Sequence, residues 1–277
     1  MLACLGALWL PAGAGASSSP ARIWRWGIDY GAATDPAVAR GYDLLVLEPD
    51  HARPIAPLRG PGSRLLGYIS VGEVERRRPF FAQLEKAGAL QAANPHWPDA
   101  RFVDLRHPAW RTLIVDTLVP DILRKGYNGI FMDTLDNAEA METKDPKGNA
   151  GMIAAAGEIV RAIRTRFPDI TIMMNRGYAL LPGTAKDVDF ILAEAMASRW
   201  SFADKRYEEM SASDWLWQAE RLRAAKRSNP SVELTTLDYW EPSDRATVKS
   251  LYERERAAGF HPYVAILALD RLLPEPQ

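Results

Sequence analysis

Eight short apolar segments, rich in β-branched and aromatic residues, recur along this 277-residue chain and limit its fold most strongly. Runs of this length and composition predict β-strands. Each is followed by polar residues and then by a helical or loop stretch, so strand and helix alternate along the whole chain. In chain order, the predicted strands are residues 23–30, 43–48, 65–71, 128–133, 170–175, 190–194, 233–239 and 263–269.

Several of the intervals between these strands have the periodicity of helices. Residues 108–125 place apolar side chains three or four positions apart and are followed by Gly126, a common helix stop. Residues 150–167, 211–227 and 243–258 repeat the pattern. Alternation of strand and helix predicts a parallel sheet, and eight repeats favour closure into a (β/α)₈ barrel, which typically needs about 250 residues. We therefore expect one α/β domain, a TIM barrel.

A polar residue, most often a carboxylate, ends nearly every predicted strand. In a (β/α)₈ barrel these strand ends meet on one face, where active sites are built. Asp and Asn after a strand often only form turns or cap the next helix. Glu is a poor turn former, and an unpaired buried charge is costly, so we expect a functional role for Glu194 and Glu73. The residues concerned are Asp29, Tyr30, Glu48, Asp50, Glu73, Asp133, Asp136, Asn175, Glu194, Asp238, Tyr239 and Asp270.

Paired carboxylates facing each other across a cleft are what glycosidic bond cleavage requires. The sequence lacks the residue patterns that other common types of catalysis need. The four His residues lack metal-ligand spacing, and the single Cys excludes a Cys-rich metal site, so no metal site is predicted. The chain has no Gly-x-Ser-x-Gly nucleophile elbow and no Gly-rich phosphate loop. A chitinase-type site is disfavoured because the alternate positions after Asp133 are Leu135 and Asn137, and neither supplies the required Glu.

Charge and the N-terminal segment indicate where the protein works. The 34 basic and 35 acidic residues give a net charge of −1, which argues against nucleic acid as a partner. Residues 2–10 are almost wholly apolar, and Ala14-Gly15-Ala16 resembles a small-residue cleavage site. We expect a signal peptide at 1–16 and a barrel domain at 17–277. Because the apolar run is shorter than the about 20 residues of a membrane span, we expect no stable membrane insertion and a secreted or periplasmic monomer.

Several motifs together resemble a known family. Residues 68–75 (YISVGEVE), 126–136 (GYNGIFMDTLD) and 175–178 (NRGY) are similar to those of endo-α-1,4-polygalactosaminidases, in glycoside hydrolase families 114 and 166. Residues 47–50, 193–194 and 237–239 extend the similarity. The resemblance implies a (β/α)₈ barrel, no cofactor, and endo-cleavage of an exopolysaccharide made of α-1,4-linked galactosamine and N-acetylgalactosamine, as found in biofilm matrix.

The same resemblance implies roles for individual residues. Asp133 would be the nucleophile and Glu194 the acid/base of a retaining reaction, with the order of these two roles left open and Glu73 as the reserve candidate. Two alternatives to the function remain: a non-catalytic carbohydrate-binding barrel, and a glycosidase of different linkage specificity. The residues implied to bind the sugar are Asp29, Tyr30, Glu73, Asp136, Asn175, Asp238 and Tyr239.

Overall fold

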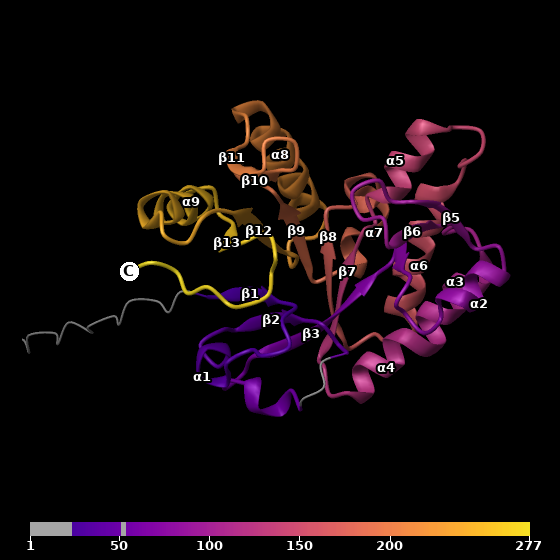
Figure 1. The fold of residues 1–277 in the computed structure, drawn as a ribbon, viewed down its shortest axis with the longest axis horizontal. Coiled ribbons are helices and arrows are strands. Elements are labelled where there is room, and N and C mark those ends of the chain that lie inside the picture. The colour runs from indigo at the N-terminus through magenta and orange to yellow at the C-terminus, as the bar shows by residue number, and fades with distance from the viewer. Residues whose placement is uncertain (1–23, 51–53) are drawn as a thin grey trace, which may run out of the picture.

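A computed structural model of the protein describes residues 24–50 and 54–277. Its centre is an eight-stranded parallel sheet in which every strand pairs with the next in the order β1-β2-β3-β7-β8-β9-β12-β13 (Figure 1). The predicted signal peptide and the first residue of the first predicted strand lie outside the described residues. The strands are β1 (Trp26–Asp29), β2 (Leu44–Leu47), β3 (Arg64–Ser70), β7 (Gly129–Asp133), β8 (Thr171–Asn175), β9 (Phe190–Glu194), β12 (Glu233–Tyr239) and β13 (His261–Ala265).

The first and last strands bring the sheet close to a closed barrel. The Trp26 indole N–H on β1 donates to the His261 carbonyl on β13 over 2.8 Å, and the Tyr30 backbone N–H donates to the Leu269 carbonyl over 2.6 Å. Within the described residues these contacts, not a continuous ladder, join the two edges. The nearly closed eight-stranded sheet confirms the predicted single-domain (β/α)₈ class.

The eighth strand differs from its prediction. It begins at His261 and ends at Ala265, whereas the sequence pattern predicted a strand over 263–269. The apolar residues that follow do not continue the ladder, because the Leu269 N–H bonds back to the Ile266 carbonyl over 3.1 Å and Leu269 itself takes a left-handed backbone conformation. An apolar run alone therefore overstated the length of this strand.

The long helices agree with the periodic segments. They are α6 (Met152–Arg166), α8 (Ala212–Ser228) and α9 (Arg245–Ala257), and Ser211 caps α8 by accepting the Asp214 N–H over 3.1 Å. The predicted helix at 108–125 consists of α3 (Pro108–Leu113), a π-helical turn (Ile114–Leu118) and α4 (Val119–Arg124). Pro120 has no N–H to donate to the carbonyl four residues earlier, which accounts for the wider π turn at this point.

Two small antiparallel sheets that the sequence pattern did not predict follow strands β3 and β9. The first contains β4 (Glu73–Glu75), β6 (Ala100–Val103) and β5 (Leu90–Ala93), and the second is the hairpin of β10 (Ser198–Ser201) and β11 (Arg206–Glu209). Both leave the barrel at the carboxyl ends of their parent strands, so they lie at the face where the strand ends meet; Figure 1 shows β10 and β11 beyond the tip of β9. The short helices are α1 (Pro36–Ala39), α2 (Phe81–Lys86), α5 (Asn137–Lys144) and α7 (Leu181–Thr184).

The core fills the space between the sheet and the helices. α6 buries Ile159, Val160 and Ile163 completely, while the barrel strands bury Phe131 and Met174. Each such side chain removed from water contributes roughly 1.5–3 kcal/mol to folding before entropy is counted. Across residues 24–50 and 54–277, none of the helices has the length and apolar character that crossing a lipid bilayer requires.

Candidate active site

Three neighbouring strands end in the residues of the candidate active site. Asp133, Asn175 and Glu194 are the last residues of β7, β8 and β9, which lie side by side and parallel. The Asn175 side-chain amide nitrogen donates to Asp133 Oδ1 over 2.9 Å and to Glu194 Oε2 over 2.6 Å. Because both bonds leave one nitrogen, these two carboxylate oxygens are at most 2.9 plus 2.6 Å apart, about 5.5 Å. The two predicted acids therefore face one another.

The residue after each of these three has a left-handed backbone conformation. Thr134, Arg176 and Ala195 have φ of 63°, 51° and 52°, a region that costs a residue with a side chain about 1–2 kcal/mol. The cost is greatest for a β-branched residue such as Thr134. Its hydroxyl accepts the Gly72 N–H over 2.7 Å, and a side chain on Gly72 would collide with the Thr134 carbonyl. Such strain gathers at functional sites, and here it occurs at three adjacent strand ends.

Two tyrosines satisfy the remaining carboxylate oxygens. Tyr68, on β3, donates its hydroxyl to Asp133 Oδ2 over 3.1 Å, and Tyr239, the last residue of β12, donates to Glu194 Oε1 over 2.6 Å. Burial, together with the adjacent carboxylates, raises the pKa of both phenols well above the usual value. Both therefore remain protonated donors at physiological pH. Tyr30 packs edge-on against Tyr68 with ring centroids 4.9 Å apart.

The carboxylate pair holds a proton more tightly than free acids do. Burial, and after it the charge of Glu194, raises the pKa of Asp133 to about 7, against the opposing effect of the Asn175 hydrogen bond. Two acids this close do not both ionise readily, and their protons belong to the pair. Because the pKa of Asp133 is raised to about 7, the pair keeps a proton up to about that pH, and a proton donor beside a carboxylate is what this chemistry requires.

The pair opens into a cleft of about 1080 Å³ with an excess of acidic side chains. Its basic residues are partly neutralised, since Arg78 bonds to Glu48 over 3.0 Å and to Asp50 over 2.9 Å. A cleft lined by one sign of charge raises the local concentration of oppositely charged ligands. The acids in the lining are Glu48, Asp50, Glu73, Glu75, Asp99, Asp121, Asp133, Asp136 and Glu194, against the bases Arg77, Arg78, Lys125 and Arg176.

Glu73 and Asp136 flank the pair in this cleft. Glu73 accepts a hydrogen bond from the Asn94 amide over 2.8 Å, and burial raises the pKa of its carboxyl. Burial also raises the pKa of Asp136, although Arg176, 3.7 Å away, opposes the shift. Glu73 is therefore held by a neutral donor, whereas Asp136 has Arg176 as a basic partner.

The structure brings seven of the nine predicted site residues to the cleft and leaves two behind it. The two are Asp29, 1% exposed, which accepts the Gly31 N–H over 2.7 Å, and the fully buried Asp238, which accepts the N–H groups of Ala197 and Ser198, each over 2.7 Å. Neither lines the cleft. The seven that do are Tyr30, Glu73, Asp133, Asp136, Asn175, Glu194 and Tyr239.

Sequence reasoning missed other residues of the site. Tyr68 could have been found, since it is a polar-tipped side chain in an otherwise apolar predicted strand. Thr134 gave no signal, because its conformation depends on contacts with β3. Trp97 lies in a loop between β5 and β6 and lines the cleft, but only the three-dimensional arrangement of the small sheet places it there.

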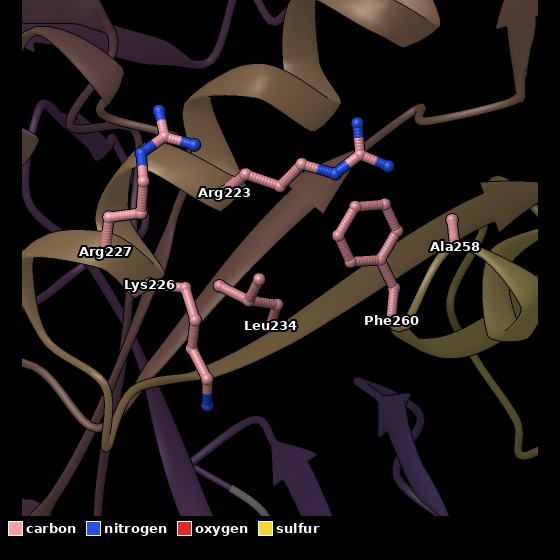
Figure 2. A pocket seen from close by; sticks show the side chains of 7 residues that line it. Arg223, Lys226, Arg227, Leu234, Ala258 and Phe260 are labelled. Atoms are coloured by element: carbon pink, nitrogen blue, oxygen red, sulfur yellow. The ribbon is translucent and has the colours of Figure 1, made fainter.

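A second depression, of about 350 Å³, lies at the amino ends of β12 and β13 (Figure 2). Arg223, Lys226 and Arg227 border it, and Figure 2 shows the Arg223 guanidinium near the ring of Phe260, 5.9 Å from its centroid. Lys226 donates to the Val232 carbonyl over 2.6 Å. None of the predicted site residues lines it, and barrel active sites lie at the opposite, carboxyl face. Among the described residues, no group of three or more His, Cys, Asp or Glu is arranged to hold a metal ion.

A nearly closed parallel barrel with two facing carboxylates at its carboxyl face has the architecture of a barrel glycosidase. Comparison with known proteins gives the family. Residues 8–275 match the model of glycoside hydrolase family GH114, and a Deinococcus radiodurans protein described as uncharacterized is 30% identical over 269 residues, 91% of this chain and 83% of that protein. The chain belongs to family GH114, and it is a glycoside hydrolase.

Solved structures of two other proteins share the fold. The glycoside hydrolase domain of PelA from Pseudomonas aeruginosa superposes with a TM-score of 0.79 at 25% identity, covering 90% of this chain and 99% of that domain. Ega3 from Aspergillus fumigatus, solved in complex with galactosamine, gives a TM-score of 0.67 at 15% identity, covering 92% and 94%.

Proposed function

We propose that this protein is an endo-acting hydrolase of α-1,4-linked galactosamine and N-acetylgalactosamine polymers that cleaves with retention of anomeric configuration. The observation that carries this proposal is the double hydrogen bond of Asn175, which keeps the carboxylate oxygens of Asp133 and Glu194 within about 5.5 Å. Retaining glycosidases have their two carboxyl groups about 5–5.5 Å apart, whereas inverting enzymes leave room for a water at about 6.5–9.5 Å.

In this proposal Asp133 is the nucleophile and Glu194 the acid/base. Asp133 accepts three hydrogen bonds, from Asn175, Tyr68 and the Thr134 N–H at 2.8 Å, whereas Glu194 accepts two. Donors stabilise the charged form of a carboxylate. These donors oppose the burial that raises the pKa of Asp133 and favour its charged form, which is the form that a nucleophile needs.

The reaction would follow in two steps. Glu194 gives its proton to the glycosidic oxygen while an Asp133 oxygen bonds to the anomeric carbon, so the leaving sugar departs as an alcohol and an ester joins the remaining sugar to the protein. Glu194, now ionised, takes a proton from water, and the resulting hydroxyl attacks the same carbon. The ester bond breaks, Asp133 regains its charge, and Glu194 is protonated again.

The cleft suits a partly cationic polymer. Its lining contains nine acids and four bases, and free amino groups on galactosamine are positively charged near neutral pH. Its volume, about 1080 Å³, is at the upper end of the roughly 300–1,000 Å³ of sites for small ligands, so it has room for more than one sugar unit, as endo cleavage requires. Tyr30, Glu73, Asp136, Asn175 and Tyr239 would contact the sugar, with Asp29 and Asp238 supporting them from behind. The proposal includes export of the protein as a monomer that acts on exopolysaccharide of a biofilm matrix.

The test is product analysis with a defined, partially acetylated α-1,4-galactosaminan. Mass spectrometry should detect internal oligosaccharides, and NMR at early times should detect the α-anomer first, which indicates retention. Early β-anomer would instead show inversion and exclude the nucleophile role of Asp133. Binding of the polymer without any product would indicate a non-catalytic sugar-binding barrel. Cleavage only of other linkages in an oligosaccharide panel would contradict the proposed substrate.

A further inference from the structure

Two exposed aromatic rings meet at the rim of the cleft although they come from different insertions. Trp97, in the loop between β5 and β6, is 53% exposed, and Phe202, in the turn between β10 and β11, is 49% exposed. Their ring centroids are 5.9 Å apart with perpendicular planes. The His96 ring stacks on the Phe202 ring, with centroids 5.8 Å apart and planes 29° from parallel. The two insertions thus build one aromatic surface, which we call the rim platform (His96, Trp97 and Phe202).

The rim platform is joined to the candidate active site by hydrogen bonds. The Asn94 side chain donates to Glu73 Oε2 over 2.8 Å and accepts the His96 N–H over 2.9 Å. The Trp97 carbonyl accepts the Ala100 N–H over 2.8 Å, which closes the loop. Trp97 lines the same cleft as Asp133 and Glu194. A ligand on the platform would therefore be held in a fixed position relative to the carboxylate pair.

The chemistry of the rim platform suits an amino sugar. One face of a pyranose ring carries mainly C–H groups and buries well against a flat aromatic face, which supplies a large apolar area with few rotatable bonds. An aromatic face also attracts an ammonium group, and Asp99, two residues after Trp97, supplies an acidic group in the same cleft lining. Large aromatic side chains so exposed, and continuous with a binding cleft, mark an interaction surface.

We propose that the rim platform is a distal subsite that stacks on an amino-sugar unit of the polymer several residues from the bond being cleaved. This rests on the proposed function. The platform gives the enzyme a preference for long chains, because only a chain long enough to occupy the carboxylate pair and the rim platform together gains both sets of contacts. Short oligosaccharides are cleaved without its help.

Kinetics on substrates of two lengths tests the proposal. With Trp97→Ala, KM for the α-1,4-galactosaminan polymer should rise about tenfold, equivalent to about 1.4 kcal/mol, with kcat unchanged. KM for a short galactosamine oligosaccharide should not change. Phe202→Ala should act in the same direction, and Trp97→Phe should restore most of the affinity because a flat ring remains.

Trp217→Ala is the matched control. Trp217 is also exposed, at 43%, but it lies on α8 under the Arg221 guanidinium, 3.5 Å from the ring centroid, and does not line the cleft. This variant should behave as wild type on both substrates. The proposal is overturned if Trp97→Ala and Trp217→Ala have the same KM on polymer, or if Trp97→Ala weakens short and long substrates equally.

A binding measurement separates this proposal from the proposed function. Calorimetry on Glu194→Gln, with and without Trp97→Ala, compares the affinities for the short and the long galactosamine oligosaccharide. A loss confined to the long ligand supports the rim platform even if the wild-type protein releases no products. No difference between the two proteins would overturn the platform even if the wild-type protein cleaves the polymer. Binding of an unrelated protein to the platform, with no length effect on sugar, would also overturn it.

Discussion

Two pairs of carboxylates in this barrel, one partly exposed and one fully buried, have different surroundings. Asp133 and Glu194 face the cleft, whereas Asp238 and Glu255 are fully buried between β12 and α9. Burial raises the pKa of Asp133 to about 7, of Asp238 to about 6 and of Glu255 to about 7. A perturbed pKa therefore does not by itself distinguish the candidate active site from a structural cluster. Access to the cleft distinguishes the two, because of these four acids only Asp133 and Glu194 line it.

The cleft pair is the more exposed of the two, yet its carboxylate oxygens are the better supplied with hydrogen-bond donors. Every carboxylate oxygen of Asp133 and Glu194 accepts a hydrogen bond. In the buried pair, Asp238 Oδ2 and Glu255 Oε2 have no partner among the described residues, although Trp215 donates to Glu255 Oε1 over 2.7 Å. The cleft pair is thus fixed in geometry, while the buried pair carries an unmet cost of desolvation. This contrast predicts which substitutions affect activity and which affect stability.

The largest effect should come from removing the charge of either cleft carboxylate. Glu194→Gln and Asp133→Asn should each lower kcat by roughly 10³-fold or more, because each loses a proton-transfer or nucleophilic step. Both should stay folded by circular dichroism, since each amide replaces a carboxylate of the same shape. Release of reducing ends from galactosaminan measures activity. Glu255→Gln, the same kind of change in the buried pair, is the control and should retain wild-type turnover. If Glu194→Gln or Asp133→Asn also retained wild-type turnover, the residue concerned would not have its assigned catalytic role.

The buried pair should instead set the pH dependence of stability. The pKa of Glu255 is raised from 4.5 to about 7 on folding, chiefly by burial and then by the charge of Asp238. The folded protein thus binds this proton more tightly than the unfolded chain. The stabilisation is complete below pH 4.5 and disappears as pH rises through 7. Glu255→Gln removes this dependence, so relative to wild type it should gain up to about 3 kcal/mol between pH 4.5 and 8.

Urea unfolding of wild type and Glu255→Gln at several pH values measures this difference. Glu158→Gln, on the surface of α6 with a side chain 57% exposed, is a matched control that should show little change with pH. A constant offset between wild type and Glu255→Gln across the range would mean that Glu255 ionises in the folded state as it does in the unfolded one, and the contrast between the two pairs would be lost.

The cleft pair was predictable from the sequence, whereas the buried pair was not, and one part of what was missed follows from strand geometry. The ends of the strands could be read from the apolar runs, so Asp133, Asn175 and Glu194 were placed on one face. Neighbouring residues of a strand point to opposite sides, so Tyr239 and Asp238 cannot both face the cleft. Sequence reasoning assigned both to the sugar site, and the same holds for Tyr30 and Asp29.

The rest depended on contacts between distant segments. The backbone strain at Thr134 needs Gly72 beneath it, and Glu255 is on α9 with no pattern to connect it with Asp238. The two small sheets had no periodic signal because their strands are only three or four residues long. Short elements of this kind are specified by tertiary packing more than by local preference.

A smaller effect should follow from removing the amide that joins the cleft pair. Asn175→Ala loses both hydrogen bonds that fix the carboxylate spacing, and misplacement on the scale of 1 Å costs roughly 10²-fold in rate. The Asn175 bond also lowers the pKa of Asp133, so its loss should raise that pKa and, because the nucleophile must be ionised, move the acidic limb of the kcat profile to higher pH. Asn149→Ala, whose amide donates to the Met141 carbonyl over 3.0 Å, is the control. An unchanged pH profile for Asn175→Ala would show that the amide does not couple the two acids.

The smallest effect should come from the tyrosine beside Glu194, and here the comparison is between two buried hydroxyls. Tyr239→Phe removes a 2.6 Å bond to the carboxylate and should lower kcat about tenfold, the equivalent of the about 1.5 kcal/mol of a hydrogen bond to a charged group. Tyr178→Phe removes a 2.7 Å bond to Gln218 outside the cleft lining. Both variants should lose about 1 kcal/mol of unfolding free energy in urea titrations. Only Tyr239 orients an acid that is proposed to meet the substrate, so only Tyr239→Phe should lower kcat. Equal kcat values for the two variants would mean that the hydrogen bond from Tyr239 to Glu194 does not contribute to turnover.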